Sequence, residues 1–186
     1  MAIDNLKPLS VESQQRLLGI ARKTIEAHLN HEVRPTFQIS DTELLVKRGV
    51  FVSLHRGEEL RGCVGYITSQ NPLYQTVAAA VGGATTKDPR FEPVQAKELP
   101  GIAIEISVLT ALERLQKVDD IEIGVHGLYV TQGRQSGLLL PQVPTSYGWD
   151  RSEFLQQTCR KAGLPDDAWK KPETEIYLFS AQVLAE

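Results

Sequence analysis

The sequence of 186 residues has very little cysteine, with one residue at position 63 and one at position 159. Two cysteines so far apart are too few for the disulfide framework that stabilises small secreted domains. They also lack the CxxC pairing of a zinc knuckle or a thiol redox motif. We therefore expect a reducing compartment and consider each thiol by itself.

The sequence also lacks a large excess of charge of one sign and long apolar runs. Twenty Lys and Arg residues against 23 Asp and Glu residues give a formal net charge of −3, so no overall positive field would attract nucleic acid. The longest apolar segment, 73–84, is far shorter than the ~18 residues that cross a membrane, and the start has no signal-peptide pattern. We expect a cytoplasmic protein that binds neither nucleic acid nor membrane.

Three segments have helical patterns. Apolar residues at a spacing of four follow Ser10, a candidate N-cap, and predict a helix that ends near Leu29. A second helix is expected over 72–84, fraying at Gly82-Gly83, and a third begins at the capping residue Asp150. These helices are expected to cover a sheet.

The other ordered segments have strand patterns. A hairpin is expected from 49–55 and 60–67, and apolar residues at every second position predict a strand over 102–108 with one solvated face. The remaining strand candidates are 121–123, 128–130, 138–140 and 176–183. Several locally connected strands and few helices predict an α+β fold with a largely antiparallel sheet flanked by helices. We expect residues 1–186 to fold as a single unit.

The candidate site centres on the segment Leu60-Arg-Gly-Cys-Val-Gly-Tyr66. Cys63 lies between Gly62 and Gly65, which would let the backbone bend or another molecule approach the sulfur, and a cation at Arg61 would favour the reactive thiolate. Cys63 could equally be a small buried residue, with the glycines serving packing. The sequence leaves both interpretations open.

A catalytic thiol also needs a base. His126, in the turn Gly124-Val-His-Gly127, is the best of the four histidines, although a turn histidine is commonly only solvated. No run of residues has the spacing of a metal site, so we predict no metal. Asp88 and Arg90, in the turn-rich segment 85–93, could pair with each other or hold an anionic ligand.

Together these motifs resemble the AMMECR domain family over residues 17–183. The residues that carry the resemblance are Leu60-Arg-Gly-Cys-Val-Gly65, Asp88-Pro-Arg-Phe91, His126-Gly-Leu128, Gly137-Leu-Leu-Leu-Pro-Gln-Val143, Trp149-Asp150 and Cys159-Arg-Lys-Ala-Gly-Leu164. The resemblance implies a compact two-lobed α+β fold with a cleft near the Arg-Gly-Cys motif. It also implies a pathway shared with Memo-like and radical-SAM proteins, which would then be partners of this chain.

The resemblance settles neither the reaction nor a cofactor, and two hypotheses remain. In the first, the protein is an enzyme or enzyme subunit in which Cys63 is the nucleophile, Arg61 and Arg90 stabilise negative charge and His126 moves protons. In the second, it is a non-catalytic binding or adaptor module, whose residues Arg61, Gly62, Gly65, Asp88 and Arg90 shape a groove for a small anionic ligand or a partner protein.

Overall fold

A computed structural model describes residues 7–186. Residues 1–6, which form most of the start that was searched for a signal peptide, lie outside the described residues. The contacts divide the described chain into an N-terminal unit, residues 7–109 and Gln182–Glu186, and a C-terminal unit, Thr110–Ala181. No helix of residues 7–186 is long and apolar enough to span a bilayer.

The N-terminal unit contains a four-stranded sheet with the order β2-β1-β3-β8. Its strands are β1 (Val50–Arg56), β2 (Glu59–Tyr66), β3 (Ile102–Leu109) and β8 (Ala181–Ala185). Strand β1 pairs antiparallel with both β2 and β3, which places β2 at one edge of the sheet.

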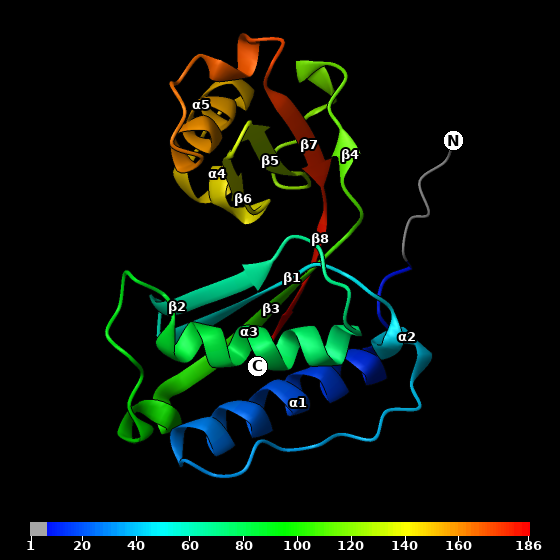
Figure 1. Ribbon diagram of the computed structural model, residues 1–186, viewed down its shortest axis with the longest axis vertical. Coiled ribbons are helices and arrows are strands. Elements are labelled where there is room, and N and C mark those ends of the chain that lie inside the picture. Colours follow the sequence, from blue (N-terminus) through cyan, green and yellow to red (C-terminus); the bar gives the residue numbers. More distant parts are fainter. Residues whose placement is uncertain (1–6) are drawn as a thin grey trace. The chain divides into compact units, whose positions relative to one another are not determined.

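Two long helices cover one face of this sheet, and they lie side by side (Figure 1). They are α1 (Val11–Leu29) and α3 (Leu73–Thr86); a short helix α2 (Thr42–Leu45) and a 3-10 turn (Ala96–Gly101) complete the unit. The Ser10 side chain caps α1 by accepting a hydrogen bond from the Ser13 N–H. Fully buried apolar residues of α1, α3 and the central strands form one core, among them Leu17, Ile25, Val52, Val77 and Ile106.

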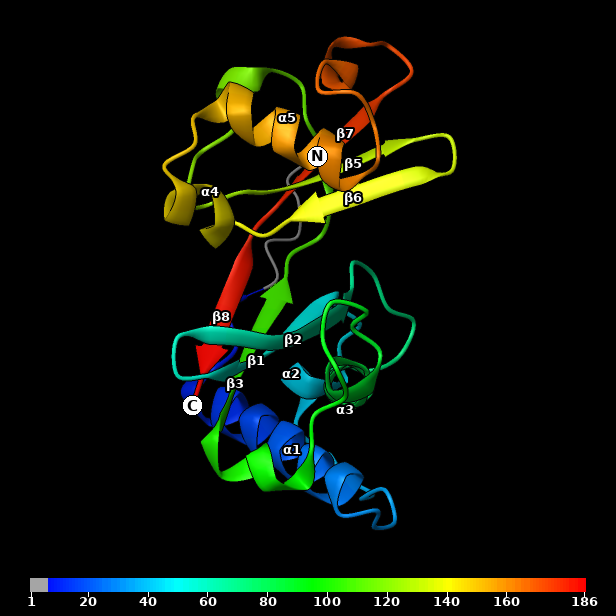
Figure 2. The same ribbon diagram turned by 90° about the vertical axis from the view of Figure 1, so that its left-hand side faces the viewer.

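The C-terminal unit contains a second antiparallel sheet, with the order β4-β7-β5-β6 (Figure 2). Its strands are β4 (Glu113–Arg114), β5 (Gly127–Gln132), β6 (Gln135–Leu139) and β7 (Glu175–Phe179). Helix α5 packs on β5 and β6, and its core residues include Phe154, Leu155 and Cys159. The other elements are α4 (Gln142–Tyr147), α5 (Arg151–Lys161) and 3-10 turns at Val118–Asp120 and Ala168–Lys170.

The structure confirms the α+β class, the antiparallel pairing, the hairpin and the three main helices, including the cap at Asp150, which accepts from the Glu153 N–H at 2.8 Å. Other predictions were wrong. Segment 121–123 forms no strand; it is irregular and leads into a turn at 123–125, and its apolar Ile121 is buried in the core. Segment 176–183 is not one strand, because Ser180 separates β7 from β8, which lie in different sheets.

Three further corrections concern helix α3, strand β3 and helix α4. Helix α3 does not fray at Gly82-Gly83 but continues to Thr86, because Gly83 lets the helix approach β2: a Cβ there would lie 2.8 Å from a methyl carbon of Val64. The polar face of β3 is not solvated throughout, since Ser107 is only 2% exposed. Helix α4, which contains Pro144, was not predicted, because proline was read as a terminator.

Candidate functional site

Asp88 binds the loop after α3 to the edge strand β2. Its carboxylate accepts a hydrogen bond from the Cys63 N–H at 2.8 Å and one from the Arg90 N–H at 3.1 Å. The guanidinium of Arg90 donates two more, from Nε at 2.9 Å and from Nη2 at 2.7 Å. The Asp88 side chain is only 3% exposed, so these four bonds replace the water that a charged carboxylate needs. We call this arrangement the Asp88 clamp.

The clamp keeps Asp88 ionised. The hydrogen bonds from the Arg90 guanidinium, followed by those from the Cys63 and Arg90 backbone, lower the pKa of Asp88 to about 2. Arg90 itself also stacks over the Phe91 ring, with its central carbon 5.3 Å from the ring centroid. Both charges of the Asp88-Arg90 pair are therefore engaged within the loop.

Arg61 forms a second, similar attachment. Its guanidinium donates to both carboxylate oxygens of Glu98, at 2.9 and 3.1 Å, and to the backbone carbonyls of Glu92 and Pro93, at 2.7 and 3.3 Å. The hydrogen bonds from the Arg61 guanidinium, followed by one from the Gln95 backbone N–H, lower the pKa of Glu98. Because Arg61 is directed to the loop 92–98, its charge is not the activating cation that the sequence suggested for the Cys63 thiol.

The glycines of the motif serve close packing. A Cβ on Gly62 would lie 2.2 Å from the carbonyl oxygen of Ala84 in α3, and a Cβ on Gly65 would lie 2.4 Å from the Phe51 ring. Contacts under 3 Å do not occur for real Cβ atoms, so side chains at both positions would force the strand away from its neighbours. Of the two roles that the sequence left open for these glycines, the geometry supports packing.

The Cys63 thiol is partly buried and neutral in character. The Ser53 hydroxyl, on the paired strand, donates to its sulfur at 3.3 Å. Burial raises the pKa of the Cys63 thiol, and this outweighs the opposing effects of the Ser53 hydrogen bond and the Arg90 charge. The direction is opposite to that of an activated nucleophile.

His126 belongs to the C-terminal unit, whereas Cys63, Asp88 and Arg90 belong to the N-terminal unit. Its imidazole Nδ1 accepts a hydrogen bond from the Glu122 backbone N–H at 3.1 Å, and the backbone N–H of His126 donates to the Glu122 carbonyl at 2.9 Å. This pairing closes the turn 122–126, so the structure gives His126 a local structural role. Within the N-terminal unit, the predicted site residues Cys63, Asp88 and Arg90 are brought together.

No group of three or more His, Cys, Asp or Glu side chains within residues 7–186 has the arrangement of a metal site. The nearest acidic neighbours of Cys63 are Asp88, which is committed to Arg90, and Glu105. Nothing in this neighbourhood identifies a cofactor.

The raised pKa predicts slow alkylation of Cys63. In the folded protein, iodoacetamide should modify it more slowly than a free thiol at neutral pH, with an apparent pKa above the ordinary thiol range. Cys159, which is fully buried, should be slower still. The measurement is the rate at each cysteine against pH by mass spectrometry, with the chain in urea as the control in which both react alike. An apparent pKa of Cys63 below the ordinary range would contradict this and restore the nucleophile hypothesis.

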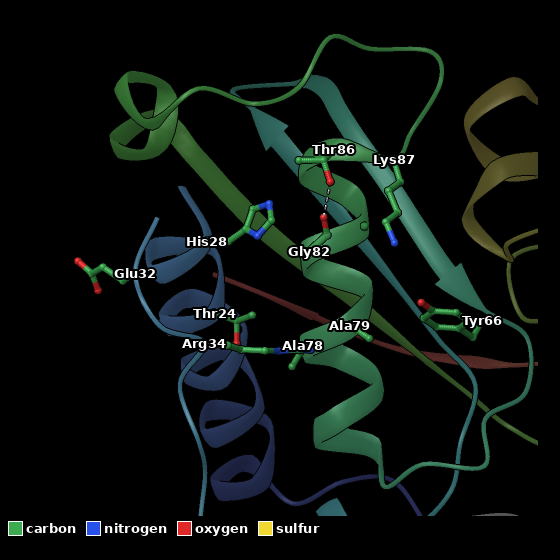
Figure 3. Close-up of a pocket in the computed structure, with 11 residues that line it drawn as sticks. Thr24, His28, Glu32, Arg34, Tyr66, Ala78, Ala79, Gly82, Thr86 and Lys87 are labelled. Carbon is green, nitrogen blue, oxygen red and sulfur yellow. Dashed lines mark hydrogen bonds between the residues drawn. The ribbon is translucent and has the colours of Figure 1, made fainter. Parts of the chain in front are cut away.

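A pocket of about 300 Å³ lies beside this region, over the outer face of α3 (Figure 3). Its floor consists of small residues at helical spacing, which keep the helix surface flat: Ala78, Ala79, Gly82, Gly83 and Thr86. A Cβ added to Gly82 would meet nothing within 4 Å, so the space above it is open. The Thr86 hydroxyl donates to the Gly82 carbonyl at 3.1 Å and caps the end of the floor.

The walls of the pocket carry several charged or polar groups. Figure 3 shows His28 and Arg34 on one side of α3 and Tyr66 and Lys87 on the other. Glu32 is the only acidic residue of the lining. The Arg34 and Lys87 cations therefore outnumber it.

The basic side chains of this pocket have no partners among the residues that the structure describes. Neither Arg34, Lys87 nor His28 makes a side-chain hydrogen bond or an ion pair with any other residue from 7 to 186, in contrast to Arg61 and Arg90. The C-terminal ends of α1 and α3 both lie here and carry partial negative charge, equivalent to roughly half a unit each. Some carbonyls near these ends accept further hydrogen bonds: those of Glu26 and Gly83 from backbone N–H groups, and that of Gly82 from the hydroxyls of Thr85 and Thr86. The Arg34 and Lys87 side chains are therefore the groups of this lining that can bind an anion directly, each through a full charge.

One known protein family matches nearly the whole chain. The AMMECR1 family model matches residues 18–184, nearly the whole chain. The protein belongs to the AMMECR1 family. This confirms the resemblance seen in the motifs. Relatives include a protein of Methanopyrus kandleri, 44% identical over 96% of this chain and 90% of its own length, and one of Methanothermobacter thermautotrophicus, also 44% identical, over 96% and 97%.

A solved structure has the same fold as this AMMECR1 protein. The crystal structure of an uncharacterised protein from Pyrococcus horikoshii superposes with a TM-score of 0.87 at 39% identity, and the match covers 97% of this chain and 92% of that one. It supports the two-sheet α+β architecture.

Sequence reasoning missed the pocket of this AMMECR1 chain. His28 was treated as a helix-end residue, Arg34 lay in an unassigned polar stretch, and Lys87 was passed over for its neighbours Asp88 and Arg90. One signal was present: Ala79, Gly82 and Thr86 recur at spacings of three and four, which places small residues on the face of α3 opposite its buried Val77 and Val81. A flat outer helix face is a natural floor for a ligand.

Proposed function

We propose that this AMMECR1 protein is a binding module for a small anionic ligand, held in the pocket over the outer face of α3. The observation that carries the proposal is that Arg34 and Lys87 line one pocket and that their side chains make no hydrogen bond or ion pair with residues 7–186. Arg61 and Arg90, in contrast, are already paired with carboxylates. An unpaired guanidinium and an ammonium on opposite sides of a flat floor can approach a phosphate or carboxylate from two directions.

In this proposal the Arg-Gly-Cys motif positions the pocket. Strand β2 ends at Tyr66, and the Asp88 clamp follows directly after Lys87. The clamp attaches Asp88, the residue next to Lys87, to Cys63 in the middle of β2. It thereby holds together strand β2 and the end of α3, which supply Tyr66 and Lys87 to one wall of the pocket. The motif residues thus act through the pocket wall and do not touch the ligand.

The other functional predictions remain untested. A catalytic role receives no support from the raised pKa of the Cys63 thiol, and His126 is engaged in hydrogen bonds of its own turn. The association with Memo-like and radical-SAM proteins and the cytoplasmic location stay predictions from the resemblance and the sequence.

The test is a titration of the whole protein with inorganic phosphate, followed by backbone amide chemical shifts. Two charge-assisted contacts, each worth about 2 kcal/mol, predict a Kd on the order of 1 mM at low salt. Arg34→Gln and Lys87→Gln should each weaken binding about tenfold or more. The control Arg134→Gln removes an equal charge from an exposed hairpin turn of the C-terminal unit and should leave binding unchanged.

The location of the shifts tests the site. They should centre on the amides of residues 28, 34, 82 and 86, and the affinity should fall as the salt concentration rises. Absence of phosphate binding, or equal loss in Arg134→Gln and Arg34→Gln, would contradict the proposal.

A further inference from the structure

A second pocket, of about 450 Å³, adjoins the first along α3. The two share Arg34, Ala78 and Ala79 in their linings. Figure 3 shows Arg34 beside Ala78, where the two pockets meet. A ligand in the first pocket could therefore extend past Arg34 into the second without a change of backbone.

The chemistry of the two pockets differs. Apart from Arg34, the lining of the second pocket is uncharged. Two aromatic side chains, Phe37 and Tyr74, pack against the core on one side and line the pocket with what remains exposed. The amide side chains of Asn71 and Gln75 also line this pocket; the Gln75 Nε2 donates to the Tyr74 hydroxyl at 2.9 Å, and the Gln75 amide oxygen can accept a hydrogen bond from a ligand.

Charge thus gathers at one end of the groove, and aromatic and amide groups at the other. Gln75 and Thr86 are eleven residues apart on α3, which corresponds to roughly 16 Å at the helical rise. Aromatic side chains favour planar rings, and amides pair with the polar edge of such rings.

We infer that the groove takes a phosphate monoester carrying a planar, hydrogen-bonding ring, the chemistry of a nucleoside monophosphate. Its phosphate lies between Arg34 and Lys87, and its ring lies against Phe37 and Tyr74, within reach of Gln75. The inference rests on the proposed anion site and adds the class of molecule that the anion belongs to.

The experiment compares three probes on the whole protein: adenosine monophosphate, inorganic phosphate and adenosine. Adenosine monophosphate should bind at least tenfold tighter than phosphate. Gln75→Ala should weaken the binding of adenosine monophosphate by roughly fivefold, as expected for one uncharged hydrogen bond, and should leave the affinity for phosphate unchanged. Arg34→Gln should weaken both. The matched control is Gln15→Ala, an exposed glutamine of α1 outside these linings.

The outcomes separate the two proposals. Equal affinity for adenosine monophosphate and phosphate, with no effect of Gln75→Ala, overturns the inference and leaves the anion site in place. Binding of neither anion overturns both. Binding of adenosine as tight as that of its monophosphate would show that the phosphate group does not contribute and would overturn the inference, while the titration with inorganic phosphate decides the anion site separately.

Discussion

Asp88→Asn is expected to lower the free energy of unfolding by about 2 kcal/mol at pH 7. The wild-type carboxyl has a pKa of about 2 in the folded protein against an ordinary value of 3.8, and each unit of difference is worth ~1.4 kcal/mol. Asparagine keeps the shape of the side chain but loses the charge that binds the Arg90 guanidinium. Each carboxylate oxygen of Asp88 accepts two of the four hydrogen bonds, so an amide NH2 group in place of either oxygen leaves two donors without an acceptor.

The pH dependence of the stability difference shows that the charge of Asp88 is its cause. Because the folded pKa is lowered, the stabilisation is fully present above the unfolded pKa, near 4, and is lost as the pH falls towards 2. The difference between wild type and Asp88→Asn should shrink over this window. Urea unfolding should be followed by far-UV circular dichroism, since both tryptophans, Trp149 and Trp169, lie in the C-terminal unit and do not report on α1 or α3.

Asp166→Asn is the matched control. Asp166 also binds an arginine through both carboxylate oxygens, but the side chains of Arg160 and Asp166 are about half exposed, at 54% and 47%. Exposed pairs contribute little, so the effect should be much smaller. A pH-independent difference for Asp88→Asn, or equal effects of the two substitutions, would contradict the role given to the clamp.

The second large effect is expected for Gly62→Ala. The added methyl group would lie 2.2 Å from the Ala84 carbonyl oxygen, and backbone on both sides must move to make room. Overpacking of this kind costs about 1–3 kcal/mol. Thermal unfolding and urea unfolding should both show the loss.

Gly82→Ala, in helix α3, is expected to have the opposite effect and to raise the free energy of unfolding. Its methyl group would meet nothing within 4 Å, and alanine in a helix interior is about 0.5–1 kcal/mol more stable than glycine. If Gly62→Ala were as stable as wild type, the glycine would not be required for packing, and the alternative role in ligand access would return.

The sequence predicted the fold wherever a local pattern determines it. Ser10 and Asp150 begin helices because their side chains accept from N–H groups a few residues later, and the alternation of Ile102, Ile104 and Ile106 fixes one strand. It failed where tertiary contacts decide. Glycine at position 83 reads as a helix end, yet its role depends on Val64, nineteen residues earlier in the chain.

The site was predicted in part for the same reason. Cys63, Asp88 and Arg90 do gather, and the possible pairing of Asp88 with Arg90 was foreseen. The partner of Arg61 could not be, because Glu98 approaches through a loop whose path has no sequence signature. The pocket was missed because its walls come from four separate segments, and only the small residues of α3 recur at a readable spacing.

The central claim is that the unpaired cations over α3 bind the ligand, while the Arg-Gly-Cys motif supports them. The most direct measurement is phosphate affinity, by amide chemical-shift titration, in wild type, Arg34→Gln and Cys63→Ser. The account predicts that Cys63→Ser binds phosphate like wild type, because the contact that holds Asp88 is the backbone N–H of residue 63, and that Arg34→Gln loses about tenfold or more. Loss of affinity in Cys63→Ser with retention in Arg34→Gln would contradict the account and place the ligand at the thiol.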